Sequence, residues 1–160
     1  MIDNTDMRHL RTAVALAEQA LNAGHSPFGS LLVSADGEVL LTDHNRDGGG
    51  ELTRHPELAI AQWAERHLDP EQRAAATVYT SGEHCPMCAG AHAWAGLGRI
   101  VYVSSAAQLR EWLREFDAPA SPTASLPITD VAPGLQVDGP AVELAEQVKL
   151  LQRRHHLGES

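Results

Sequence analysis

The chain has 160 residues, 43% of them hydrophobic, which suits one compact domain rather than two. Its 12 basic and 21 acidic residues give a net charge of −9, and this acidic excess argues against a large nucleic-acid-binding surface. No apolar run approaches the roughly 20 residues that cross a bilayer, and the acidic N-terminus lacks the features of a signal peptide. We therefore expect a single domain over residues 1–160, a cytoplasmic location and no membrane partner.

The spacing of apolar residues in the first half predicts a helix over about 5–23, strands over 28–34 and 38–41, and a helix over 56–67. Thr5 or Asp6 is the expected N-cap of the first helix, and Gly24 follows its end. The pair Asp36 and Gly37 between the two strands is a strong hairpin signal.

The second half predicts a strand over 77–81, a helix over 86–95, a strand over 99–104, a helix over 108–116, a short strand near 128–131 and a helix over 140–156. Residues 118–127 hold three prolines and form a loop. We expect Trp94, Trp112 and Phe116 in the core. Because strands alternate with helices after a hairpin, the fold class is α/β, with three layers and a sheet that is part antiparallel and part parallel.

Two short motifs carry the chemistry, H-x-E at 55–57 and C-x-x-C at 85–88. His55, Cys85 and Cys88 supply one nitrogen and two sulfurs, a set that suits Zn²⁺ and leaves a fourth tetrahedral position for water, as in catalytic zinc sites. The two cysteines share one face of a helix start, where the thiolate form is favoured. Glu57 is close enough to move protons on and off that water. The combination is typical of zinc deaminases.

Two other interpretations of these motifs remain. The C-x-x-C pair alone is also typical of thioredoxin-like redox sites, although that interpretation leaves His55 and Glu57 without a role. A structural zinc site with a further histidine as fourth ligand is the second alternative, although structural sites usually combine two ligand pairs and the chain has no second C-x-x-C.

With these motifs, the chain resembles the cytidine deaminase-like superfamily, and within it the bacterial nucleoside and nucleobase deaminases, including guanine deaminases and tRNA adenosine deaminases. The similarity extends over about 13–105. It implies an α/β/α sandwich with a mixed five-stranded sheet, Zn²⁺ on His55, Cys85 and Cys88, and Glu57 as the proton shuttle. It also implies that Asn45 contacts the base.

Several residues near the motifs bear on the substrate. The alternative role for Asn45 is structural, as an asparagine that ends a strand at a turn. Phe28 either stacks on the ring of the substrate or is a core residue. Many members of the superfamily have proline where this chain has His84, and alanine where it has Pro56, which points to an altered pocket.

The leading hypothesis is a zinc-dependent hydrolase of C–N bonds in cyclic amidines. It would convert an exocyclic amino group of a free nucleobase or similar heterocycle, guanine-type or triazine-like, to a carbonyl and release ammonia. The alternatives are a cytosine or cytidine deaminase, a tRNA adenosine deaminase, which would need a basic rim, and a zinc-stabilised binding domain without activity. We also expect the protein to form a homodimer. Its expected ligand is a small nucleobase-like or nucleoside-like molecule rather than a nucleic acid.

Overall fold

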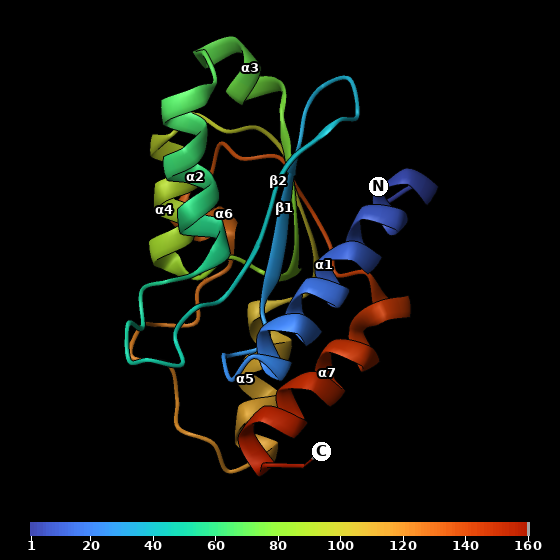
Figure 1. The fold of residues 1–160 in the computed structure, drawn as a ribbon, viewed down its shortest axis with the longest axis vertical. Coiled ribbons are helices and arrows are strands. Elements are labelled where there is room, and N and C mark those ends of the chain that lie inside the picture. The colour runs from blue at the N-terminus through green and yellow to red at the C-terminus, as the bar shows by residue number, and fades with distance from the viewer. Residues whose placement is uncertain (160) are drawn as a thin grey trace.

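The computed structural model describes residues 1–159 and shows three layers, a central sheet between two groups of helices (Figure 1). The strands are β1 (Gly29–Val33), β2 (Val39–His44), β3 (Thr77–Gly82), β4 (Ile100–Ser104) and β5 (Val137–Asp138). Their order across the sheet is β2-β1-β3-β4-β5. β1 is antiparallel to β2 and β3, whereas β3, β4 and β5 run parallel. The predicted α/β sandwich with a mixed five-stranded sheet is therefore confirmed.

The helices are α1 (Asn4–Asn22), α2 (Pro56–His67), α3 (Pro70–Ala75), α4 (Pro86–Trp94), α5 (Ala106–Glu115), α6 (Ile128–Val131) and α7 (Val142–Leu157). α1, α5 and α7 cover one face of the sheet, and α2, α4 and α6 cover the other (Figure 1). Within the described residues, no helix combines the length and the apolar character that a bilayer crossing requires.

The sheet is buried on both faces because each face carries its own apolar cluster. In β1, all five residues are buried, and Leu31 packs with the α1 side while its neighbour Leu32 packs with the α2 side. This alternation follows from the period of two in a strand. At Gly29 the backbone of α1 comes so close that a Cβ atom would lie 2.5 Å from the carbonyl oxygen of Ala13. Only glycine fits there.

The start of α1 differs from the prediction. Its N-cap is Asp3, whose carboxylate accepts a hydrogen bond from the backbone N–H of Asp6, while the Asp6 carboxylate accepts one from the N–H of Asp3. The expected N-cap of Thr5 or Asp6 is therefore wrong, because this reciprocal pair places Asp6 in the first turn. The predicted hairpin at Gly37 is confirmed, with a positive φ of 87° at that residue.

The segment expected as the last strand is also different. Residues 128–131 form the single turn α6, and the fifth strand is β5, nine residues further along, which pairs with β4. The β-branched residues of 128–131 favour a strand locally. Ile128 is fully buried against Ala89 and Ile100, however, and this packing, rather than local propensity, determines that the segment forms a helical turn. The short helix α3, which begins with a capping box at Asp69, was not predicted.

The predicted aromatic core is confirmed for two of three residues. Trp112 and Phe116 are buried between α5 and the sheet. The expectation that Trp94 lies in the core is wrong, since 91% of its side chain is exposed. Trp94 is the last residue of α4, whose buried face carries Cys88, Ala89 and His92 instead.

Candidate active site

The two predicted metal-binding motifs both lie at helix N-termini on the same face of the sheet. His55 is the N-cap of α2 and Cys85 is the N-cap of α4, and each is followed by a proline at the first helical position. Proline suits that position because its φ is already helical and it has no N–H to leave unpaired. The residue before a proline is driven into extended backbone, which matches ψ values of 144° at His55 and 166° at Cys85.

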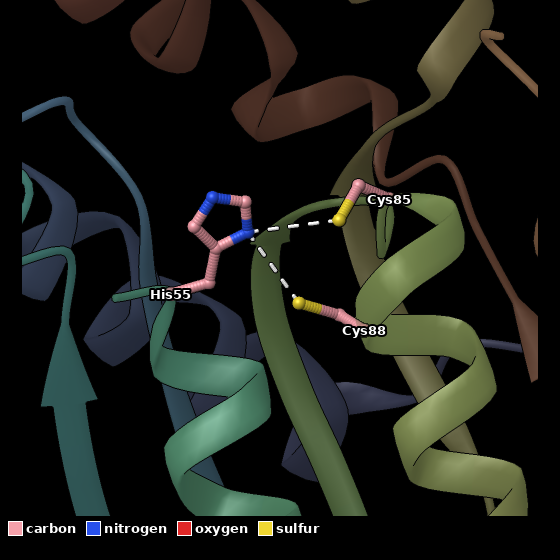
Figure 2. Close-up of side chains that lie close together, drawn as sticks. All are labelled: His55, Cys85 and Cys88. Carbon is pink, nitrogen blue, oxygen red and sulfur yellow. Dashed lines mark hydrogen bonds between the residues drawn. The ribbon is translucent and has the colours of Figure 1, made fainter. Parts of the chain in front are cut away.

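The three candidate ligands converge (Figure 2). Nδ1 of His55 lies 3.6 Å from Sγ of Cys85 and 3.4 Å from Sγ of Cys88, and all three ligand atoms lie within 4.8 Å of one another. Tetrahedral zinc, with Zn–N near 2.0 Å and Zn–S near 2.3 Å, places nitrogen and sulfur ligands about 3.5 Å apart. The set therefore fits a zinc ion, with Nδ1 as the nitrogen that faces the sulfurs.

Hydrogen bonds within this cluster shift the pKa values of all three side chains. The pKa of Cys85 is lowered to about 4, first because the Cys88 thiol hydrogen-bonds to its sulfur and then because His55 does so, although burial opposes the shift. The same hydrogen bond, together with burial, raises the pKa of Cys88. The pKa of His55 is raised by its hydrogen bond to Cys85. The three side chains thus hold protons between them that a metal ion would displace.

Glu57 lies in the first turn of α2, directly beyond His55, and only 6% of it is exposed. Its Oε1 accepts a hydrogen bond of 3.0 Å from Oγ1 of Thr80 in β3. Burial raises the pKa of this carboxyl above its usual value, although the hydrogen bond from Thr80 and the nearby His55 act in the opposite direction. Glu57 is therefore a buried carboxyl group that faces the same space as the candidate ligands.

That space is a cavity of about 240 Å³. Its lining residues come from both halves of the chain: Ser26, Phe28, Asn45, Asp47, His55, Glu57, Glu83, Cys85, Leu109, Leu113, Pro119, Ser121, Gln152, His155 and His156. No lysine or arginine is among them. The cavity has one end at the metal cluster and a wall made by α5, the loop after it, and α7.

The residues expected to bind substrate, Asn45 and Phe28, both line the cavity. His84 and Pro56 do not. Pro56 is buried at the start of α2, and His84 lines a second, largely apolar cavity of about 370 Å³ beside the first. Neither ring nitrogen of His84 has a hydrogen-bond partner within residues 1–159.

Asp47, just beyond β2, was not singled out from the sequence. Its Oδ1 accepts from the N–H of Ser26 at 2.9 Å, and its Oδ2 accepts from Oγ of Ser26 at 2.6 Å and from Nδ2 of Asn45 at 3.2 Å. Burial alone would raise the pKa of Asp47, but the hydrogen bonds from Ser26 and Asn45 outweigh it and the pKa is lowered. The carboxylate therefore ties Asn45 to the loop before β1.

Glu83 and three residues of α7 also belong to the site, although the sequence did not predict them as site residues. Glu83 joins the metal turn to the cavity wall, since Oε1 accepts from the N–H of Ala106 and Oε2 from the N–H of Ile128, both at 2.8 Å. Its position two residues before Cys85 was the available signal. Gln152, His155 and His156 reach the cavity from α7, and nothing in their local sequence indicates this.

Comparison with known proteins agrees with this geometry. A model of the cytidine and deoxycytidylate deaminase zinc-binding region matches residues 3–104. A probable cytosine deaminase of Schizosaccharomyces pombe is 33% identical over 102 residues, or 63% of this chain and 61% of that protein. Guanine deaminase of Bacillus subtilis is 35% identical over 97 residues, or 59% of this chain and 62% of that protein. The chain thus spans about three fifths of the length of these relatives, which also include tRNA-specific adenosine deaminases.

The fold extends beyond the matched region. A solved structure of a complex with 2,6-diaminopurine superimposes with a TM-score of 0.73, covering 100% of this chain and 86% of that chain at 17% identity. This likeness confirms the cytidine deaminase-like fold, including the part that follows residue 104. With the zinc-binding region matched over residues 3–104 and the three candidate ligands assembled in one cluster, the chain belongs to the cytidine and deoxycytidylate deaminase family.

Proposed function

We propose that this chain is a single-domain, zinc-dependent hydrolytic deaminase of a free nucleobase or similar heterocycle, of the guanine or amino-triazine type. It replaces an exocyclic amino group on a ring carbon with a carbonyl oxygen, consumes one water and releases one ammonia. The observation that carries the proposal is the convergence of His55, Cys85 and Cys88 with the buried Glu57 at one end of a single cavity.

The roles of the residues follow from their positions. His55, Cys85 and Cys88 would hold the zinc ion, which supplies a nucleophile by lowering the pKa of a water molecule. Glu57 would take a proton from the attacking water and deliver it to the departing amino group, which otherwise leaves poorly. Thr80 holds one oxygen of Glu57 by a hydrogen bond and so fixes the carboxyl group in the cavity.

The size and charge of the cavity favour a small uncharged substrate. Its volume of about 240 Å³ suits a small heterocycle. Two carboxyl groups besides Glu57, those of Asp47 and Glu83, line the wall, while lysine and arginine do not. A phosphate group at this wall would therefore meet like charge without a lysine or arginine to pair with. One structural neighbour binds 2,6-diaminopurine, a ring of the proposed class.

Cytosine or cytidine is the second candidate substrate, because a probable cytosine deaminase is 33% identical to this chain. A tRNA substrate would need a basic surface for its backbone, and the net charge of −9 opposes this. A binding domain without activity has no need of a buried carboxyl group beside the metal ligands, because burying such a group is costly. The cytoplasmic location and the homodimer expected from the sequence remain part of this proposal.

The test is ammonia release by the zinc-loaded protein with guanine, 2,6-diaminopurine, an amino-triazine, cytosine, cytidine and a tRNA anticodon stem-loop. We expect the largest kcat/KM with a free purine or triazine. Faster reaction with the stem-loop than with any free base or nucleoside would overturn the proposal, as would the absence of ammonia from every compound. Faster reaction with cytosine or cytidine would favour the second candidate.

A further inference from the structure

Two primary amide side chains line the cavity, and both are almost completely buried. Asn45 follows β2 and is 3% exposed, and Gln152 lies in α7 and is 1% exposed. They come from parts of the chain 107 residues apart. Each amide has one acceptor oxygen and one donor NH₂ group, so its orientation decides which of the two it offers to a ligand.

The orientation of Asn45 is set by Asp47. Nδ2 of Asn45 donates to Oδ2 of Asp47 at 3.2 Å. An ionised carboxylate only accepts hydrogen bonds, so the NH₂ group must face Asp47 and the carbonyl oxygen must point away. That oxygen, Oδ1, is buried and has no partner within residues 1–159. Asp47 is itself held at two points by Ser26, so it is a fixed reference for the amide.

The orientation of Gln152 is set in the same way. The one hydrogen bond of its side chain within residues 1–159 runs from Nε2 to the backbone oxygen of Pro27, at 3.3 Å. A backbone carbonyl also only accepts, so the NH₂ group must face Pro27. The carbonyl oxygen Oε1 of Gln152 accepts no hydrogen bond within residues 1–159, so it is free to accept one from a ligand in the cavity that Gln152 lines.

We propose that Asp47 is a positioning residue which, together with the Pro27 carbonyl, turns the two amides so that the cavity presents two carbonyl acceptors to the substrate. The substrate is then a neutral heteroaromatic ring with N–H donors on at least two edges besides the amino group that leaves. Rings of the diaminopurine or triamino-triazine kind meet this requirement, whereas rings with acceptors on those edges do not. This inference rests on the proposed function and narrows its substrate class.

The physical basis is the cost of unpaired polar groups in a closed cavity. A ring that places N–H groups against both oxygens pairs the buried Oδ1 of Asn45, which is otherwise unpaired, and Oε1 of Gln152, which accepts no hydrogen bond within residues 1–159. A ring that lacks one N–H leaves an oxygen unpaired, and a ring nitrogen in that place would repel it. Sites built to pair such groups discriminate strongly against ligands that lack them.

The test compares the affinity of rings that differ only in one amino group. Zinc-loaded protein carrying Glu57→Gln, which should not turn the ligand over, is titrated by calorimetry with 2,6-diaminopurine, 2-aminopurine and 6-aminopurine. We expect the diamino ring to bind at least about tenfold more tightly than either mono-amino ring, the effect of one or two hydrogen bonds. In the same background, Asp47→Asn should reduce this preference at least about fivefold. An amide at position 47 can donate as well as accept, so it no longer fixes which way the Asn45 amide faces.

Two further variants complete the design. Gln152→Met keeps the length of the side chain but removes its acceptor, and should also reduce the preference at least about fivefold. Asp43→Asn is the matched control, since Asp43 pairs with Arg46 and does not line this cavity. It should leave the preference unchanged within about twofold. Urea unfolding establishes that each variant is folded, and if Asp47→Asn is not, the result for Gln152→Met decides.

An unchanged preference in the folded variants, or no preference for the diamino ring in the background protein, would overturn the inference. Loss of affinity for all three rings in equal proportion would also overturn it, because it would indicate a general weakening of the cavity. These outcomes are separate from failure of the proposed function, since ammonia release by the protein with Glu57 intact is measured independently.

Discussion

Among single side chains, Glu57 has the contacts that a proton carrier needs. It is nearly enclosed, one oxygen is held by Thr80, and it lines the cavity beside His55 and Cys85. A glutamine at this position keeps the shape and can still accept the hydrogen bond from Thr80, but it cannot carry a proton.

We therefore expect Glu57→Gln to retain zinc and fold while kcat falls by about 10²–10⁴-fold, the usual contribution of a general acid–base group. Steady-state kinetics, metal analysis and thermal unfolding measure the three quantities. Glu65→Gln, on the exposed side of the same helix, is the control and should leave all three unchanged. Retention of more than about a tenth of the turnover would mean that another group carries the proton.

At this scale the sequence predicts the metal cluster well and the rest of the cavity poorly. His55, Glu57, Cys85 and Cys88 form two local motifs whose residue types and spacing already predict a zinc site with a proton carrier, and three of them form a cluster that could hold a metal ion. Asn45 was accessible only through family resemblance. Gln152 meets the cavity through packing of α7 against the loop before β1, and no local pattern encodes a contact between positions 125 residues apart.

Among the helices, α2 and α4 carry the three candidate ligands at their N-termini, so a bound zinc ion would join them. Because no preformed site exists in the unfolded chain, the free energy of zinc binding is also free energy of folding. We expect about one zinc per chain by elemental analysis, and a lower melting temperature after treatment with a strong chelator or in Cys85→Ala. A loss of only 3 kcal/mol corresponds to about 6–12 °C in a chain of this size.

This expectation has a clear counter-outcome. Zinc well below one equivalent in protein prepared without chelators would contradict it, as would a melting temperature that does not respond to chelation. Restoration of the melting temperature by added Zn²⁺ but not by Mg²⁺ would show that the sulfur and nitrogen ligands are responsible, since Mg²⁺ prefers oxygen ligands.

Glu83 connects two more helices to the metal turn. One carboxylate oxygen accepts from the first N–H of α5 and the other from the first N–H of α6. Glu83→Gln keeps one acceptor and turns a donor toward the other N–H. We expect a loss of about 1–2 kcal/mol in the free energy of unfolding, as for other lost helix caps. Urea denaturation measures it, with Glu111→Gln on the exposed face of α5 as a control that should stay within about 0.5 kcal/mol.

The limits of prediction for whole elements have physical causes. The helix over 56–67 was predicted with its observed bounds because a proline and an apolar stripe mark it. Residues 128–131 were misassigned because a run of four residues has no measurable period, and burial of Ile128 then decides. β5 has two residues, too few for any pattern, and its pairing with β4 comes from the tertiary structure.

Across the whole molecule, one ionic network joins the N-terminal helix to the sheet. Arg99 donates to both oxygens of Asp6 in α1 and to Asp138 in β5, and the Tyr79 hydroxyl in β3 donates to Asp6. Burial would raise the pKa of Asp6, but the hydrogen bonds from Arg99, Asp3 and Tyr79 outweigh it and lower the pKa from 3.8 to about 2.

This shift makes stability depend on pH with a definite sign. The pKa of Asp6 is lower in the folded chain, so its contribution is present above about pH 4 and is lost as the pH falls from about 4 to about 2. At 1.36 kcal/mol per pKa unit, the contribution is about 2 kcal/mol. Urea unfolding midpoints, measured at pH values from 7 to 2, should decrease as the pH is lowered from about 4 to about 2. Asp6→Asn should be less stable at pH 7 and lose part of the acid dependence, whereas an unchanged acid profile would contradict the assignment.

The division of the cavity between the two halves of the chain has a consequence for how its specificity can change. The proposed metal ligands and proton carrier lie between positions 55 and 88, inside the region shared with the family, whereas α5 and α7 lie after it. Substitutions at cavity-lining positions of α5 and α7, such as Leu109 and Gln152, can therefore reshape the wall while the reactive groups stay on other elements. A change in the ring that the cavity accepts can thus come from the C-terminal third of the chain, which lies outside the matched region.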